Sequence, residues 1–391
     1  MSKFSSPVVP DPAALAAVQR LCDLDTPYRT GKDTDELFLD AMREIIGWHG
    51  GRCGFYRDLL DREGFAPGQL RTMDDLPRIP FIHANFFKSH SIRSIPEEDI
   101  EITLTSSGTM GQKSQMSFDR WSIAAGRRMV DFVYDHFGWF EPGRETNYLV
   151  SNYEPEEGST RGTTNTSRYL TKYAPARHVN YVLRLTGEGT HEFDLFGSIE
   201  VLKRYEAEGL PVRMIGFPSF IFFILDRMKK LGERNLRLHE DSLVFFAGGW
   251  KGYADRQLSK PELYARLGEQ LGIPDSRCRD GFGSVEHSVP YVECGHHHMH
   301  VPVWSRVFIR DVRNLEVLGY GKPGYLCFVT PYITSVPAVS VMMGDLAILH
   351  DAKDCGCGIA TPWFEVAGRA GISKNKSCAV SAAELLKKES I

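Results

Sequence analysis

A loop rich in hydroxyl groups and glycine follows a predicted strand at residues 100–105. Glycine permits positive φ angles and a close approach of the backbone to an anion, while hydroxyl and N–H groups bind phosphate oxygens. The loop is not a Walker A motif, because Gln112 rather than glycine precedes Lys113. We interpret it as a phosphate-binding loop, and the alternative is a plain turn of serine and threonine. Its residues are Thr105, Ser106, Ser107, Gly108, Thr109, Met110, Gly111, Gln112, Lys113 and Ser114.

Cysteine and histidine residues gather in two later segments. Cys294 is followed by Gly-His-His-His-Met and His300, and Cys355-Gly356-Cys357 comes about 55 residues later. Three thiolates and one imidazole form a closed tetrahedral zinc set, which is typical of a structural site because no coordination position stays open for a substrate. His297 and His298 are alternatives to His300 as the imidazole ligand. The opposing interpretation is free cysteines beside an exposed polar loop.

The elements that must position these residues indicate an α/β protein. Apolar spacing is helical in the N-terminal segment, residues 1–75, and strands and helices alternate from residue 100 to 247. The prolines at 77 and 80 predict an extended segment over 76–91, and Gly and Pro turns from 306 to 349 predict a small β subdomain. A last short helix is expected at 381–388. We therefore expect layered mixed sheets with helices.

Composition excludes several classes of protein. The 391 residues are 42% hydrophobic and 25% charged, and 46 Lys+Arg against 50 Asp+Glu leave a net charge of −4, which provides no general basic field for nucleic acid or anionic membrane. No apolar run reaches the roughly 20 residues of a membrane span, and the N-terminus lacks the apolar run of a secretory signal. Eight cysteines are too sparse for a disulfide scaffold in this length. We expect a cytoplasmic protein.

Four short segments, taken in order, resemble the motifs of the adenylate-forming enzymes, which include acyl-CoA synthetases and phenylacetate-CoA ligases. The Gly-rich loop resembles their phosphate loop, and residues 281–286, Gly-Phe-Gly-Ser-Val-Glu, resemble their aromatic-Gly-x-x-Glu segment. Gly344-Asp345 resembles their Gly-Asp pair, and Gly368-Arg369 resembles the Gly-Arg near their hinge. The resemblance predicts the large domain of the adenylate-forming fold.

The same resemblance implies a role for each residue. Phe282 and Gly283 would lie against adenine, Glu286 would help to hold Mg²⁺, Asp345 would bind the ribose hydroxyls and Arg369 would face phosphate. These roles suit the chemistry of the side chains, because Glu is a hard oxygen ligand and Arg pairs well with phosphate. Gly248 and Gly249 belong to the segment 244–250, which resembles the family segment that ends next to the substrate carboxylate and adenine. Taken singly, Asp345, Glu286 and Arg369 could also be a turn residue, a solvated carboxylate and a surface ion pair.

Within the superfamily, Ile79-Pro80-Phe81 and Phe86-Phe87-Lys88 resemble the LuxE-type acyl-protein synthetases, which are close relatives of the phenylacetate-CoA ligases. Only residues 370–391 follow Arg369, so we expect the C-terminal lid domain of the acyl-CoA synthetases to be truncated. This predicts an adenylation domain over 76–367, with a zinc-binding β subdomain at about 290–360, and a tail over 368–391. Some phenylacetate-CoA ligase relatives have a zinc loop that Cys-x₅-His-Val-Pro resembles, which favours His300.

The tail carries Cys378, and in the LuxE-type enzymes a cysteine near the C-terminus receives the acyl group. Lys374 and Lys376 lie beside it, and neighbouring cations favour the nucleophilic thiolate. These lysines are also candidates for the residue that assists adenylation. An incidental surface cysteine is the alternative interpretation.

The resemblance therefore implies a ligase that uses ATP and Mg²⁺, with structural Zn²⁺. It would convert a carboxylic acid, with a fatty acid favoured, to acyl-AMP, transfer the acyl group to Cys378, and pass it to an acceptor protein such as a fatty acyl reductase. The aromatic segments 216–223 and 244–250 could line an acyl pocket, but they leave an aryl acid open. One alternative is a ligase that delivers the acyl group to coenzyme A or a carrier protein. The other is a non-catalytic, nucleotide-binding regulatory protein.

Overall fold

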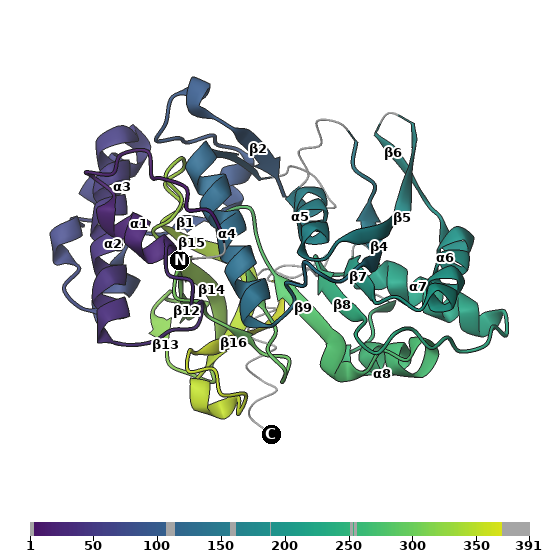
Figure 1. Ribbon diagram of the computed structural model, residues 1–391. Coiled ribbons are helices and arrows are strands. Elements are labelled where there is room, and N and C mark those ends of the chain that lie inside the picture. The colour runs from purple at the N-terminus through teal and green to yellow at the C-terminus, as the bar shows by residue number, and fades with distance from the viewer. Residues whose placement is uncertain are drawn as a thin grey trace. The chain divides into compact units, whose positions relative to one another are not determined.

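The computed structural model describes residues 4–106, 114–156, 162–187, 189–250, 253 and 256–369. The chain divides into two compact units (Figure 1). The first holds the described residues up to 136 and from 284 onward, and the second holds those from 137 to 283. In sequence, the second unit is thus an insertion into the first.

A mixed sheet is the centre of the first unit. Its order is β11-β16-β15-β14-β12-β13, with antiparallel neighbours, and β1 lies parallel to β15. β14 and the first half of β15 are largely buried, as their apolar sequences predict. A separate hairpin is formed by β2 and β3, and β10 is a short strand. The strands are β1 (Ile82–His83), β2 (Ile102–Thr105), β3 (Gln115–Phe118), β10 (Tyr291–Val292), β11 (Met299–His300), β12 (Arg306–Arg310), β13 (Val317–Leu318), β14 (Pro323–Val329), β15 (Ser340–His350) and β16 (Trp363–Arg369).

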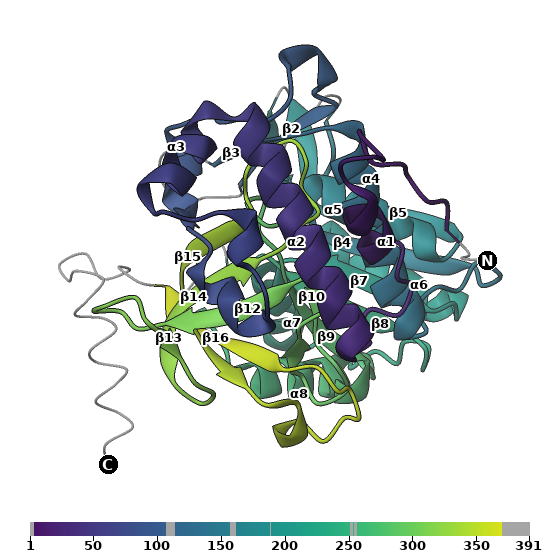
Figure 2. The ribbon, with the colours of Figure 1, turned by 90° about the vertical axis from the view of Figure 1, so that its left-hand side faces the viewer.

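Four helices belong to this unit: α1 (Ala16–Cys22), α2 (Lys32–Arg52), α3 (Gly54–Arg62) and α4 (Arg120–His136). Figure 2 shows α2 crossing in front of the sheet. Its buried residues Phe38, Met42 and Ile45 recur at helical spacing, so that one face is apolar. Arg306 of β12 lies over the Phe38 ring at 4.2 Å and forms an ion pair with Asp35 at 2.8 Å. These contacts hold α2 against the sheet.

The buried segment before β15 is held by side chains of α2. Trp48 Nε1 donates to the Thr334 carbonyl at 2.9 Å, and His49 Nε2 lies 3.0 Å from the Ile333 carbonyl. His49 Nδ1 lies 2.6 Å from Ser94 Oγ. Burial lowers the pKa of His49 to about 3, so the imidazole is neutral at physiological pH. These bonds satisfy buried carbonyls in the irregular backbone that leads to β15.

The second unit is a mostly parallel sheet with connecting helices. Six of its strands are arranged in the order β9-β8-β7-β4-β5-β6. Neighbours in this order are parallel, except that β6 runs antiparallel to β5. Apolar residues of the helices and the strands form one core, for example Leu202, Leu225, Val244 and Leu267. The elements are β4 (Thr146–Tyr153), α5 (Gly162–Leu170), β5 (Ala176–Gly187), β6 (Thr190–Phe193), α6 (Leu195–Glu208), β7 (Val212–Gly216), α7 (Pro218–Lys230), β8 (Leu243–Ala247), α8 (Lys260–Leu271) and β9 (Cys278–Phe282).

The predicted alternation of strands and helices is present; one expectation differs from the structure, and two elements were not predicted. The segment expected to be extended at 76–91 is extended only around β1, because the 3₁₀ helices Met73–Arg78 and Ala84–Lys88 take up its beginning and part of its second half. A capping box of Thr72 and Asp75 starts the first of these helices. The β5–β6 hairpin was not predicted from the sequence, and the burial of its longer strand β5 does not alternate regularly. Helix α8 was not predicted either; it begins at Lys260 after the cap Ser259, with Pro261 in its first turn. The helix expected at 381–388 lies outside the described residues.

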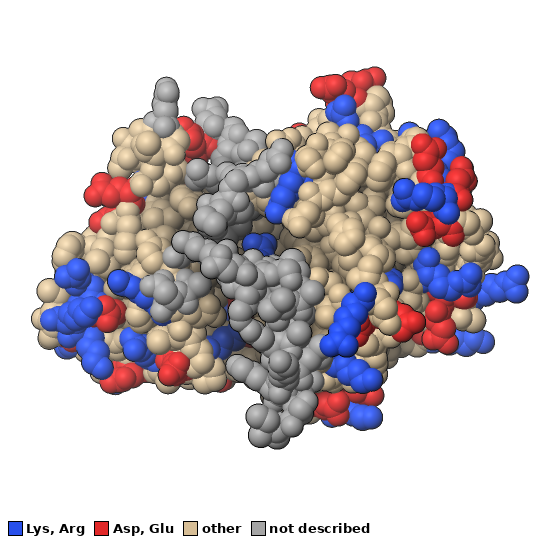
Figure 3. Space-filling model, turned by 180° about the vertical axis from the view of Figure 1, so that it is seen from behind, with Lys and Arg blue, Asp and Glu red and all other residues tan. Residues whose placement is uncertain are grey.

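The surface agrees with the balanced composition. On the face drawn in Figure 3, Lys and Arg side chains are interspersed with Asp and Glu side chains. Within the described part of the chain, no helix combines the length and the apolar character that crossing a membrane requires.

Candidate nucleotide and metal sites

Two residues predicted to bind nucleotide are partners across neighbouring strands. Asp345 of β15 pairs in register with Arg369, the last residue of β16, and Arg369 Nε lies 3.4 Å from Asp345 Oδ1. The register shifts between Leu346 and Ala347, and Gly368 has a φ of +148°. This irregularity, which glycine accommodates, brings together two residues that are 24 positions apart in the sequence.

The two side chains differ in exposure. The Asp345 side chain is 13% exposed and that of Arg369 is 64% exposed. Burial raises the pKa of Asp345, Arg369 opposes that shift, and the negative charge of Glu286 adds to it. Asp345 and Glu286 are thus two carboxylates close enough to interact, with an exposed guanidinium beside one of them. Such a group can bind hydroxyls, a divalent cation and phosphate.

Glu286 is buried in a tight turn of the first unit. The Ser288 N–H donates to the Ser284 carbonyl at 2.7 Å, and Ser288 has a left-handed φ of 54°. The next side chain, His287, is buried, with Nε2 2.8 Å from Tyr291 Oη and 3.2 Å from Ser305 Oγ. Burial lowers the pKa of His287 to about 3. No motif of the sequence indicates this neutral histidine, because its hydrogen bonds depend on how the chain folds around it.

The motif over 281–286 passes from one unit to the other, since Phe282 and Gly283 belong to the second unit. Gly281 of β9 pairs in register with Ala247 of β8, so that Phe282, the last residue of β9, and the pair Gly248-Gly249, which follows β8, lie at the carboxyl ends of adjacent parallel strands. Gly248 and Gly249 have left-handed φ angles of +86° and +67°. Ligands of α/β sheets bind at such ends.

The predicted phosphate loop is described only at its base. Thr105 ends β2, the Ser106 N–H donates to the Ser114 carbonyl at 3.0 Å, and the Ser114 N–H donates to Ser106 Oγ at 3.0 Å. These bonds close a hairpin. The other predicted loop residues and the predicted catalytic residues of the tail lie outside the described residues; they are Ser107, Gly108, Thr109, Met110, Gly111, Gln112, Lys113, Lys374, Lys376 and Cys378.

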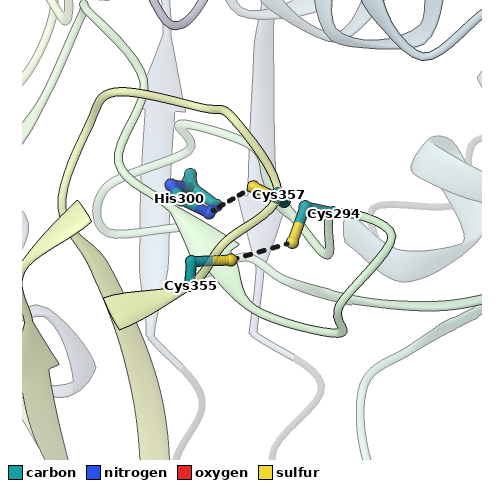
Figure 4. A group of neighbouring side chains, drawn as sticks. All are labelled: Cys294, His300, Cys355 and Cys357. Carbon is teal, nitrogen blue, oxygen red and sulfur yellow. Dashed lines mark hydrogen bonds between the residues drawn. The ribbon is translucent and has the colours of Figure 1, made fainter. Parts of the chain in front are cut away.

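The predicted metal ligands lie together in the first unit. One potential ligand atom from each residue lies within 4.8 Å of the others, and Figure 4 shows the four side chains pointing toward one another. Cys294 Sγ lies 3.6 Å from Cys355 Sγ, and Cys357 Sγ lies 3.2 Å from His300 Nε2. Cys294, His300 and Cys355 are buried, and Cys357 is half-buried. The set and its closeness fit a tetrahedral Cys₃His centre.

Hydrogen bonds around the cluster distinguish His300 from His297, whereas His298 also faces a sulfur. His300 Nδ1 lies 2.7 Å from the Thr361 carbonyl, so it carries the proton and directs the lone pair of Nε2 at Cys357. His297 Nδ1 instead lies 3.3 Å from a carboxylate oxygen of Glu293. The contact with the Thr361 carbonyl could not be predicted from the sequence, because a backbone group has no residue-type signal.

Other donors face the sulfur atoms. The His296 N–H lies 3.3 Å from Cys294 Sγ, and the Ile359 N–H lies 3.4 Å from Cys357 Sγ. His298 Nδ1 lies 3.1 Å from Cys355 Sγ. Burial raises the pKa of the Cys355 thiol, and its neighbouring cysteines add to the shift. A bound cation would offset that cost and favour the thiolates.

Comparison with known proteins decides the family. The profile described as "Acyl-protein synthetase, LuxE" matches residues 24–387. The chain belongs to the LuxE family of acyl-protein synthetases. It is 26% identical over 354 residues to the long-chain-fatty-acid–luciferin-component ligase of Aliivibrio fischeri, covering 89% of this chain and 88% of the relative. It is 23% identical over 338 residues to the phenylacetate-coenzyme A ligase of Thermus thermophilus, covering 81% of this chain and 66% of that protein.

The fold of this LuxE-family chain is that of the adenylate-forming enzymes. It superimposes on the crystal structure of an open 2-hydroxyisobutyryl-CoA ligase in complex with 2-HIB-AMP and CoA, with a TM-score of 0.66 and 15% identity. The match covers 95% of this chain and 81% of the other. The predicted family, the predicted fold class and the prediction of a ligase are therefore confirmed. The acyl-protein synthetase activity is favoured over the coenzyme A ligase and the non-catalytic protein.

Proposed function

We propose that this LuxE-family ligase activates a fatty acid with ATP and transfers the acyl group first to Cys378 and then to an acceptor protein. The observation that carries the proposal is the cross-strand pair of Asp345 and Arg369 beside Glu286, in a chain that the family profile matches over 24–387. Residues 76–367 would act as the adenylation domain, and 368–391 would carry the acyl acceptor.

The proposed reaction has two steps. In the first, a carboxylate oxygen of the acid attacks the α-phosphorus of ATP, and the bond to the β-phosphate oxygen breaks to release pyrophosphate. In the second, the Cys378 thiolate attacks the acyl carbon, and the bond from that carbon to the AMP oxygen breaks. AMP leaves, and a thioester remains on the enzyme.

The chain's own residues would bind and orient the reactants. Asp345 would accept hydrogen bonds from the ribose hydroxyls, and Arg369 would offset phosphate charge from its exposed position. Glu286 would hold Mg²⁺, which neutralises phosphate charge. Thr105 and Ser106 would lead into the phosphate loop, and Phe282, Gly283, Gly248 and Gly249 would lie against adenine and the substrate carboxylate.

The substrate and acceptor are proposed from the relatives. The name of the Aliivibrio fischeri relative includes a long-chain fatty acid and a luciferin component. We extend that name to a fatty acid substrate and to a protein acceptor, for which a fatty acyl reductase is a chemically suitable candidate.

Cys294, His300, Cys355 and Cys357 would hold one structural Zn²⁺. The support is a donor set of three sulfurs and one imidazole whose other nitrogen is already bound to a carbonyl. Three free thiols at one centre need a reducing compartment, which favours the cytoplasm.

Intact-protein mass spectrometry tests the acyl transfer. The protein is incubated with ATP, Mg²⁺ and a panel of fatty and aryl acids, and wild type is compared with Cys378→Ser and with the matched control Cys53→Ser, which removes another cysteine. We expect a hydroxylamine-sensitive acyl adduct on wild type and on Cys53→Ser, and none on Cys378→Ser. No adduct on wild type, with AMP released only when coenzyme A is added, would instead support a coenzyme A ligase.

Elemental analysis tests the metal site. We expect about one zinc ion per chain in wild type and in His297→Asn, and loss of that zinc in His300→Ala. Asparagine suits position 297 because that residue has a left-handed φ of 62°. Equal zinc content in both variants would contradict the ligand assignment.

A further inference from the structure

We propose that the metal centre of Cys294, His300, Cys355 and Cys357 holds β16 in register and thereby places Arg369 opposite Asp345. The four ligands would then be positioning residues for nucleotide binding. This inference rests on the proposed function, because it links the proposed zinc site to the proposed nucleotide site.

The position of β16 in its sheet leaves it weakly held at one end. Its outer neighbour β11 pairs with it only at Met299–Phe364 and His300–Trp363. From Glu365 onward, β15 is the neighbour to which β16 is paired in the described sheet. The residues from Glu365 to Arg369 are also exposed, whereas Trp363 and Phe364 are buried. The exposed half of the strand therefore gains little from burial and depends on its buried beginning.

The metal centre lies at that buried beginning. Cys355 and Cys357 come from the loop that leads into β16, and His300 belongs to β11, which pairs with the start of β16. The His300 ring reaches the Thr361 carbonyl, and the Val301 N–H donates to the Pro362 carbonyl at 2.8 Å. A metal bound to all four ligands would join the two segments on either side of this pairing.

Stacking of side chains aligns the same end. The centroid of the Trp363 ring lies 3.6 Å from that of the His298 ring and 3.9 Å from that of the His350 ring, and the Trp363 ring is nearly parallel to both. His350 is the register partner of Trp363 on β15, and His298 also contacts Cys355 Sγ. The first residue of β16 is thus in contact with both neighbouring segments and, through His298, with a proposed metal ligand.

The end of β16 that carries Arg369 depends on the metal centre at the other end, because the pairing of β16 with β15 is irregular. The pairing shifts between Leu346 and Ala347, just before the Asp345–Arg369 pair. A slip of one residue would move Arg369 by about 3.3 Å along the strand and would turn its side chain to the other face of the sheet. The 3.4 Å contact between Arg369 Nε and Asp345 would then be lost.

The experiment combines hydrogen exchange with ATP binding. Exchange of the amides in 365–369 and the Kd for ATP with Mg²⁺ are measured on the zinc-loaded protein, after metal removal by a chelator, and after zinc is added back. His300→Ala is compared with the matched control His297→Asn, and Arg369→Ala serves as a reference that alters the nucleotide contact without altering the metal centre.

We expect metal removal and His300→Ala to accelerate exchange in 365–369 about tenfold or more and to weaken ATP binding about tenfold, as the loss of one charge-assisted contact would. Strands β4, β7 and β8 should keep their protection, added zinc should restore the wild-type protein, and His297→Asn should behave like wild type. Arg369→Ala should weaken ATP binding with zinc bound and with little change of exchange elsewhere in β16.

The inference would be overturned if amide exchange in β16 did not change after metal loss, or if it rose equally in every strand. It would also be overturned if the protein bound no metal. Absence of ATP binding by the zinc-loaded protein would instead count against the proposed function. The exchange of 365–369 decides whether the metal centre holds the strand in either case, because it does not depend on nucleotide. Faster exchange in 365–369 after metal loss, together with an unchanged Kd for ATP, would refute the link between the metal centre and the placement of Arg369.

Discussion

Replacing Asp345 with asparagine should weaken ATP binding and at the same time stabilise the fold. The substitution keeps the size of the side chain and one oxygen acceptor, and it removes the negative charge. A hydrogen bond to a charged group is worth roughly 1.5–3 kcal/mol, so losing one such bond to a ribose hydroxyl should raise the Kd for ATP about 10- to 100-fold. Arg369 loses its partner, but its side chain is 64% exposed, so solvent replaces that interaction at little cost.

The effect on stability follows from the raised pKa of Asp345. Burial is the largest cause of the shift, and the contact with Arg369 does not fully offset it. Because the folded protein holds this proton to a higher pH than the unfolded chain does, the charged carboxylate destabilises the fold at neutral pH. That destabilisation begins above the ordinary pKa of aspartate, is complete above the raised pKa, and disappears as the pH falls through this window. Asp345→Asn removes it.

Two assays separate these effects. Isothermal titration with ATP measures affinity, and thermal unfolding over a series of pH values measures stability. We expect the Tm of Asp345→Asn to exceed that of wild type at pH 8, with a difference that shrinks toward acid pH. Wild-type affinity in the variant would refute the ribose assignment, and a lower Tm at pH 8 would refute the argument from burial.

Three further predictions concern stability alone. In Gly324→Ala, the new Cβ would lie 2.3 Å from the Arg310 carbonyl oxygen, so β12 and β14 must separate. We expect the free energy of unfolding in urea to fall by about 1–3 kcal/mol, and an unchanged unfolding midpoint would contradict this packing. Ser259→Ala removes the cap of α8 and should cost about 1 kcal/mol by the same assay, whereas a loss near zero would mean that solvent replaces the cap. His49 and His287 have pKa values lowered to about 3 and gain protons on unfolding, so the stability of the protein should fall as the pH drops from about 6.5 toward 3. The variants His49→Gln and His287→Gln should each make this pH dependence less steep. An equally steep profile would contradict the neutral state of these histidines in the folded protein.

Local patterns predicted many of the elements because their signals are short in range. The helical spacing in α2 and α4 and the apolar runs of β7 and β8 depend only on neighbouring residues. The same reasoning was only partly right at 76–91, where 3₁₀ helices lie on both sides of the short extended stretch that contains β1. It also did not find β5, whose burial shows no regular period, or α8, although Leu263, Leu267 and Leu271 recur at helical spacing after the cap Ser259.

Residue types alone determined which side chains could do chemistry in this protein: three cysteines with a nearby histidine, and the carboxylates and arginine of the nucleotide motifs. Only the tertiary structure decided that His300 rather than His297 faces the thiols, because this depends on the Thr361 carbonyl 61 residues away. Only the tertiary structure placed Arg369 opposite Asp345, because strand register depends on pairing between distant segments and here also on a β-bulge. A sequence specifies the chemical groups locally, whereas their geometry follows from contacts that form only when distant segments pack together.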